Sequence, residues 1–124
     1  MGVERIARFA SEHLERLDAV FTPGELTYCA GKRRRDEHLA ARFAAKEAVL
    51  KSLGTGLRRR MHWTDVEVIR EPSGRPRVRL HGEVAEAAQR RGVESIEISL
   101  SHAAGIAVAG AVVVCAPADG GPAG

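Results

Sequence analysis

The hydrophobic and polar residues of the chain follow a helical spacing in its first half and an alternating one in its second half. Apolar side chains at every third or fourth position predict amphipathic helices over 1–17 and 36–53, the latter with Asp36 as its N-cap. Thr22, followed by a proline and a glutamate, predicts the start of a short helix over 23–30. We therefore expect a largely helical first half.

The second half has the pattern of two hairpins separated by a helix. Strict alternation over 65–68 and 77–80, on either side of a Pro-Ser-Gly turn, predicts a β-hairpin with one solvated face. An Ala-rich segment at 83–91, which precedes a glycine, predicts a helix. Strands at 96–101 and 106–114 complete an α+β fold, and the nearly continuous apolar residues of 106–114 predict a central strand that is covered on both faces.

Glu47 and Lys51 are the candidate catalytic residues. They lie four positions apart in the predicted helix, so one face carries both the carboxylate and the ammonium group, and Gly54, Thr55 and Gly56 follow. A magnesium-bound pyrophosphate needs an oxygen ligand, a cation and a backbone that it can approach. The same spacing is also typical of a surface salt bridge that contributes about 0.3–0.5 kcal/mol, so spacing alone leaves both interpretations open.

Size and composition are those of a small protein with one domain. The chain has 124 residues, of which 44% are hydrophobic, and we expect a domain over 1–115 followed by a disordered Ala/Pro/Gly tail over 116–124. No apolar run reaches the ~18 residues of a membrane span, so a cytoplasmic protein is expected. Cys29 and Cys115 have no zinc-site spacing and are expected to be reduced.

The positive charge of the chain favours an anionic partner. The net charge is +3, and basic runs at 32–35 and 58–60 flank the predicted central helix. A coenzyme's phosphates, an acidic carrier protein and a nucleic acid all fit this charge. Aromatic residues make up only 4% of the chain and no recognition motif is present, which argues against nucleic acid.

Several sequence blocks resemble the holo-acyl-carrier-protein synthases, the small class of 4′-phosphopantetheinyl transferases. The helix Arg-Phe-Ala-Ala-Lys-Glu-Ala at 42–48, with Lys51 and the Gly-Thr-Gly of 54–56, is similar to the signature of this family. Four further blocks resemble the family in the same order, namely 21–26, 63–68, Gly-Arg-Pro at 74–76 and Ser-Leu-Ser-His at 99–102.

The resemblance implies a phosphopantetheinyl transferase fold, in which antiparallel hairpins pack against a long central helix, and a trimer with its sites between protomers. It implies a Mg²⁺-dependent reaction that transfers 4′-phosphopantetheine from coenzyme A to a serine of an apo acyl carrier protein. The products would be holo carrier and adenosine 3′,5′-bisphosphate. Carriers of fatty acid biosynthesis and of secondary metabolism both remain open.

The resemblance also implies roles for individual residues. Glu47 would bind the metal and share in removing the serine proton, while Lys51 would neutralise phosphate charge. Residues expected to bind coenzyme A are Arg42, Lys46, Gly54, Thr55, Gly56, Arg75, Pro76, Ser101 and His102. For Arg42 and Lys46, packing of the site is the alternative. Arg5 and Arg8 would contact the carrier protein.

Ser101 and His102 also invite comparison with a hydrolase dyad. Neighbouring residues of a strand point to opposite faces, however, and no nucleophile-elbow motif surrounds them. Serine hydrolase chemistry is therefore not expected.

One family feature has no counterpart in this sequence. Family members carry a strand ending in Gly-x-Asp, whose aspartate is a second metal ligand, before a helix that resembles residues 3–7. This chain begins at Met1, within that region. Either the coding start lies upstream, or a short form binds Mg²⁺ less well because it has lost one carboxylate. A degenerate homologue that binds coenzyme A or carrier protein without turnover is the corresponding alternative function.

Overall fold

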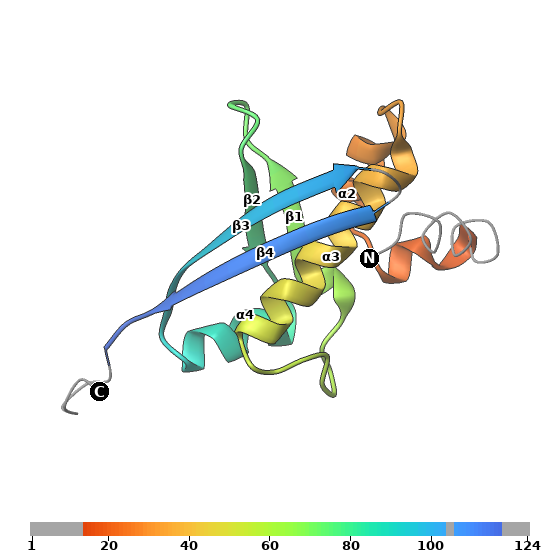
Figure 1. The fold of residues 1–124 in the computed structure, drawn as a ribbon. Coiled ribbons are helices and arrows are strands. Elements are labelled where there is room, and N and C mark those ends of the chain that lie inside the picture. The colour runs from red at the N-terminus through yellow and green to blue at the C-terminus, as the bar shows by residue number, and fades with distance from the viewer. Residues whose placement is uncertain (1–13, 104–105, 118–124) are drawn as a thin grey trace.

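The computed structural model describes residues 14–103 and 106–117, which form two antiparallel hairpins and a long helix (Figure 1). The elements are the 3₁₀ turn η1 (Leu14–Ala19), α2 (Pro23–Ala30), α3 (Arg35–Ser52), the 3₁₀ turn η2 (Trp63–Asp65), β1 (Val66–Arg70), β2 (Pro76–Leu80), α4 (Gly82–Arg90), β3 (Val93–Ala103) and β4 (Ile106–Cys115). The predicted α+β class is confirmed. Most of the helix predicted over 1–17, with Arg5 and Arg8, and most of the predicted tail lie outside the described residues.

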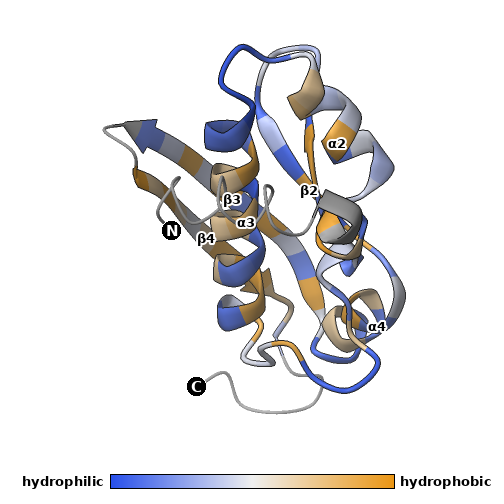
Figure 2. Ribbon diagram, turned by 90° about the vertical axis from the view of Figure 1, so that its right-hand side faces the viewer, coloured by the Kyte–Doolittle hydropathy of each residue, from blue (hydrophilic) through white to orange (hydrophobic). Residues whose placement is uncertain are grey.

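Helix α3 is the element on which the other parts pack. It runs along the β3–β4 hairpin and also contacts β1 and α2 (Figure 1). Its Ala, Leu, Lys and Glu content favours helix, and both hydrophobic and hydrophilic residues lie along it (Figure 2). No helix of the described residues has the length and hydrophobicity needed to cross a bilayer.

The predicted N-caps of α2 and α3 had different outcomes. The capping box of α2 is confirmed: Glu25 N donates to Thr22 Oγ1 (3.2 Å), and Thr22 N donates to Glu25 Oε1 (2.9 Å). The prediction of Asp36 as N-cap is wrong, because the N-cap of α3 is Arg34, two residues earlier, and no side-chain hydrogen bond forms there. Asp36 lies in the first turn instead, where its charge still interacts favourably with the helix dipole.

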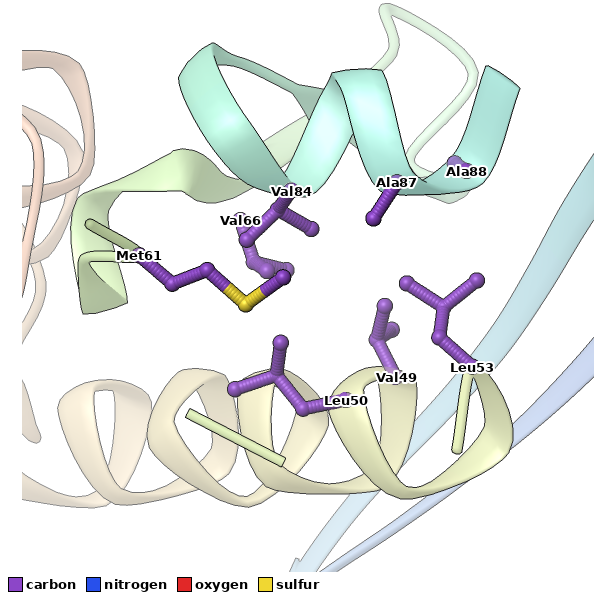
Figure 3. Packing of buried hydrophobic residues seen from close by; sticks show 8 residues of the cluster. All are labelled: Val49, Leu50, Leu53, Met61, Val66, Val84, Ala87 and Ala88. Carbon is purple, nitrogen blue, oxygen red and sulfur yellow. The ribbon is translucent and has the colours of Figure 1, made fainter. Parts of the chain in front are cut away.

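Two hydrophobic clusters hold the fold together. In the first, η1 and α2 pack against the N-terminal half of α3; its buried members are Leu17, Phe21, Cys29, Leu39, Ala40, Ala41 and Ala107. In the second, α4 faces the C-terminal half of α3 (Figure 3). Its buried members are Val49, Leu50, Leu53, Met61, Val66, Val84, Ala87 and Ala88. The two clusters fix α3 from end to end.

Strand β4 corrects the expectation of a central strand covered on both faces. Within the described residues it pairs only with β3, and only the face with Ala107 packs toward α3. The other face is apolar and open, since Ile106, Val108, Val112 and Val114 are 57%, 61%, 62% and 44% exposed. The apolar pattern was a correct indication of two hydrophobic faces, but one chain covers only one of them.

Candidate functional site

Glu47 and Lys51 line one cleft between α3 and β4, of about 380 Å³, together with Ala44, Ala48 and residues 106–109. Glu47 is half-buried and Lys51 is exposed. Neither side chain makes a hydrogen bond or an ion pair with any described residue, so the surface salt bridge that their spacing allows is not formed. The cleft therefore offers one carboxylate and one ammonium group to a ligand.

The donor atoms of this cleft can be compared with those that Mg²⁺ prefers. Mg²⁺ is commonly held by one or two carboxylates together with substrate phosphates and water. Glu47 is the carboxylate of this cleft, and no group of three or more His, Cys, Asp or Glu residues suited to a metal occurs among the described residues. The donor set thus fits a cation that a bound pyrophosphate helps to hold.

The backbone amide groups of the loop 54–56 donate hydrogen bonds to the last carbonyl groups of α3. Gly54 N donates to Lys51 O (2.9 Å), while Thr55 N and Gly56 N donate to Leu50 O (3.2 and 3.3 Å). The first two bonds form a Schellman motif, for which Gly54 has the required positive φ of 74°. A phosphate would find none of these three amides free, whereas the buried Thr55 hydroxyl has no hydrogen-bond partner among the described residues.

Arg42 carries a buried positive charge. The residue is 1% exposed, its guanidinium lies 4.4 Å from the centroid of the Tyr28 ring, and none of its side-chain nitrogens has a hydrogen-bond acceptor within the described chain. A buried cation left in this state is costly unless an anion pairs with it. Arg42 is therefore suited to binding an anion.

His102 lies on the face of β3 that packs toward α3, where it contacts residues of the same helix as Arg42. Its Nδ1 is 3.2 Å from Glu37 Oε2, within ion-pair distance for a protonated imidazole but not in hydrogen-bond geometry. The ring of His38 stacks edge-on at 5.4 Å. Ser101 is exposed on the opposite face, so the argument against a Ser-His dyad is confirmed.

His38 is a further residue of α3 that lies close to Arg42. It is half-buried, and its ring lies between those of Tyr28 and His102. Burial lowers the pKa of His38, and the positive charge of Arg42 lowers it further. A neutral His38 is thus favoured beside the cationic Arg42.

Lys46 lies on the inner side of α3. Its ammonium donates to Glu25 Oε1 (2.7 Å), to Trp63 O (3.2 Å) and to Val66 O, and its side chain is 0% exposed. Burial lowers its pKa, an effect that the charge and the hydrogen bond of Glu25 oppose. Its three donor positions have acceptors within the chain, so its contacts fit packing of the site and not phosphate binding.

Comparison with known proteins decides the family. The model of the 4′-phosphopantetheinyl transferase superfamily matches residues 3–109. The chain belongs to this superfamily. A holo-acyl-carrier-protein synthase of Moorella thermoacetica is 48% identical over 111 residues, which cover 90% of this chain and 86% of the relative. That of Geotalea daltonii is 45% identical over 110 residues, 88% of each protein.

Solved structures of this superfamily show the same fold. The Helicobacter pylori holo-acyl-carrier-protein synthase in complex with coenzyme A has a TM-score of 0.80 and 27% identity, covering 92% of this chain and 95% of that chain. The Mycobacterium tuberculosis acyl carrier protein synthase has a TM-score of 0.70 and 37% identity, covering 94% and 92%. The resemblance drawn from the sequence blocks is confirmed.

Arg75 and Pro76 lie elsewhere in this transferase fold. They line a second cleft of about 540 Å³ between the two hairpins, where Arg75 forms an ion pair with Glu97. This cleft shares no lining residue with the cleft of Glu47 and Lys51. Within one chain, Arg75 and Pro76 are therefore not in the same cleft as Glu47 and Lys51.

The sequence interpretation missed several residues that lie around the candidate site. Tyr28, Glu37 and His38 surround Arg42 and His102, and Arg91 reaches the end of α3. The four-residue spacing of His38 and Arg42 was an available signal, because it places both on one helix face. The contact of Arg91 spans 38 residues and has no local signal.

Proposed function

We propose that this chain transfers the 4′-phosphopantetheine group of coenzyme A to a serine of an apo acyl carrier protein, with Mg²⁺. The observation that carries the proposal is that Glu47 and Lys51 line one cleft and that neither has a partner among the described residues. In a purely structural role the two side chains would neutralise each other. The names of the relatives and the coenzyme-bound Helicobacter pylori structure support the same reaction.

The reaction needs charge neutralisation more than a protein nucleophile. The carrier's serine oxygen would attack the β-phosphorus of coenzyme A, and the bond to adenosine 3′,5′-bisphosphate would break, with its electron pair staying on the bisphosphate oxygen. The serine proton would pass to solvent, with Glu47 sharing in its removal. Lys51 would neutralise charge on the phosphates, and Glu47 would hold the metal. When bound, Mg²⁺ supplies further positive charge to the pyrophosphate.

Arg42 and His102 would bind another phosphate of the coenzyme. Buried and without a hydrogen-bond acceptor in the described chain, the guanidinium of Arg42 can make the bidentate, charge-assisted hydrogen bonds that a phosphate accepts. His102 could add a donor once a phosphate replaces Glu37 as its neighbour. Tyr28, with its ring against Arg42, would keep the guanidinium in place.

A homotrimer would complete the site. The open apolar face of β4, with Val108 and Val112 more than half exposed, is the kind of surface that proteins cover with a partner. Coenzyme A bound between protomers could contact Glu47 of one and Arg75 and Pro76 of another. The contact proposed between the carrier and Arg5 and Arg8 rests on the resemblance, because both lie outside the described residues.

The alternative function is binding without turnover. Glu47 is the single carboxylate that lines its cleft in the described part of the chain, whereas a second one strengthens Mg²⁺ binding. In that case coenzyme A would bind through Arg42 and Lys51, but transfer would be slow or absent.

Intact-mass analysis of an apo carrier after incubation with the chain, coenzyme A and Mg²⁺ tests the proposal. We expect an added phosphopantetheine with the wild type and none with Glu47→Gln. Glu86→Gln, which removes an exposed carboxylate of α4, is the matched control and should stay active. An unmodified carrier with retained coenzyme binding would support the alternative, and loss of both would refute the proposal.

A further inference from the structure

The backbone amides of the loop do not bind all of the carbonyl groups at the end of α3. The carbonyl groups at a helix C-terminus carry partial negative charge, which opposes the approach of a phosphate. The Schellman motif pairs the carbonyls of Leu50 and Lys51 with the amides of the loop. The carbonyl of Leu53 is bound instead by a side chain, since Arg91 donates to it from Nη1.

Arg91 comes from a distant element that is rigidly placed. It is the C-cap of α4, and its own backbone amide donates to Ala87 O and Gln89 O. Helix α4 packs on α3 through the second hydrophobic cluster (Figure 3). The Arg91 guanidinium therefore approaches the end of α3 from a fixed position. The contact therefore couples the loop 54–56 to the core.

Gly54 is the residue that makes this contact possible. Its φ of +74° disfavours residues with a side chain, and a Cβ at this position would lie 3.0 Å from Arg91 Nη1. On the other side of Gly54, Arg58 Nε donates to Thr55 O (2.9 Å). The carbonyls before and after the glycine are thus each bound by an arginine.

We infer that Arg91 is a positioning residue for coenzyme A binding, an inference that rests on the proposed function. It fixes the loop that follows Lys51, and its charge offsets the negative end of α3 where the pyrophosphate would bind. It acts through the loop and does not itself touch the reacting atoms. Arg58 supports the same loop through Thr55.

Three variants test this role. Arg91→Met removes the donor and the charge, and Arg91→Lys keeps the charge but loses the guanidinium fork. Arg90→Met is the matched control, because Arg90 is the neighbouring arginine and bonds Glu83 instead of the loop. Steady-state transfer to an apo carrier gives KM for each substrate, and calorimetry with coenzyme A and Mg²⁺ gives the dissociation constant.

For Arg91→Met we expect a KM and a dissociation constant for coenzyme A about tenfold higher, the usual effect of losing one hydrogen bond to a charged group. The KM for the carrier should not change. Arg91→Lys should have an intermediate value, and Arg90→Met should match the wild type. Hydrogen exchange at the Thr55 and Gly56 amides should be faster in Arg91→Met.

Coenzyme A binding by a folded variant separates positioning from a purely structural role, and thermal unfolding shows whether the variant is folded. A folded Arg91→Met that binds coenzyme A like the wild type would overturn the inference, whatever its melting temperature. If Arg91→Met does not fold, Arg91→Lys replaces it in this test. A KM for coenzyme A equal to that of the wild type would then overturn the inference. A wild-type chain that neither binds coenzyme A nor modifies a carrier would refute the proposed function itself, which is a distinct result.

Discussion

The ammonium group of Lys46 lies 2.7 Å from Glu25 Oε1, and both side chains are 0% exposed. This ion pair joins α3 to α2, and the second oxygen of Glu25 accepts a hydrogen bond from Val68 N of β1 (2.9 Å). The pair therefore connects three elements beneath the site. Because Lys46 precedes Glu47, and consecutive helical residues are rotated by about 100°, the pair also sets the direction in which Glu47 leaves the helix.

Breaking this pair should destabilise the protein strongly. We expect Lys46→Met to lower the free energy of unfolding by about 3–5 kcal/mol, because it leaves the Glu25 carboxylate buried without its cation. Chemical denaturation measures this change. The double variant with Glu25→Gln should lose less than the sum of the single variants, and strictly additive losses would show that the two residues are not coupled.

Removing the charge of Lys51 should affect the reaction and leave the fold intact. Lys51 is exposed and has no partner among the described residues, so Lys51→Met should unfold at the wild-type temperature. Its transfer rate should fall by about 100- to 1,000-fold, as expected when a group that stabilises transition-state charge is lost. Arg90→Met removes an exposed cation that does not line this cleft, and a comparable loss in this control would argue for a general charge effect.

Arg42 offers a test of phosphate recognition. If its guanidinium pairs with the 3′-phosphate of coenzyme A, Arg42→Met should weaken coenzyme A binding by at least about tenfold, the value of one charge-assisted interaction. Binding of dephospho-coenzyme A, which lacks this phosphate, should change much less. Calorimetry with both ligands measures the difference. Equal losses for the two would place Arg42 away from this phosphate.

Glu67 should make stability depend on pH in the acid range. Burial raises its pKa, but hydrogen bonds from Thr22 and His81 and the charges of His81 and Arg79 outweigh this effect, so the pKa lies below its ordinary value of 4.5. The native state then binds the proton less readily than the unfolded chain. The resulting stabilisation is complete above pH 4.5 and is lost as the pH falls through the native pKa.

The variant Glu67→Gln tests this dependence. It should lose about 1 kcal/mol of stability at neutral pH, a typical value for such hydrogen bonds, and its stability should fall less steeply below pH 4.5 than that of the wild type. Denaturant titrations at several pH values give both quantities. Parallel pH profiles for the two proteins would contradict the assignment.

The open face of β4 should decide the oligomeric state. Val108 is 61% exposed and lies opposite Ser101 on β3, so Val108→Asp adds a charge to this face with little effect on the hairpin itself. We expect the wild type to be a trimer and the variant a monomer in sedimentation velocity. Leu57→Asp, at another exposed apolar residue, is the control and should remain trimeric. A wild type that is monomeric would contradict the proposed assembly.

The sequence by itself determined the local structure and the central pair. Helical and alternating spacings depend only on near neighbours, so the elements from Pro23 to Cys115 were predictable to within a few residues. The same reasoning correctly put Glu47 and Lys51 on one face of α3, because residues four positions apart share a helix face. Sequence blocks in family order then identified the superfamily.

Only the tertiary structure decided what the other charged residues do. Lys46 and Lys51 are both lysines of one helix, yet the first is buried against Glu25 and the second is exposed, because α2 and β1 cover just one side of α3. Arg91 donates a hydrogen bond to the carbonyl of Leu53, 38 residues away in the sequence, because α4 packs against α3. Such contacts depend on how distant elements pack, and this packing has no signature in local spacing.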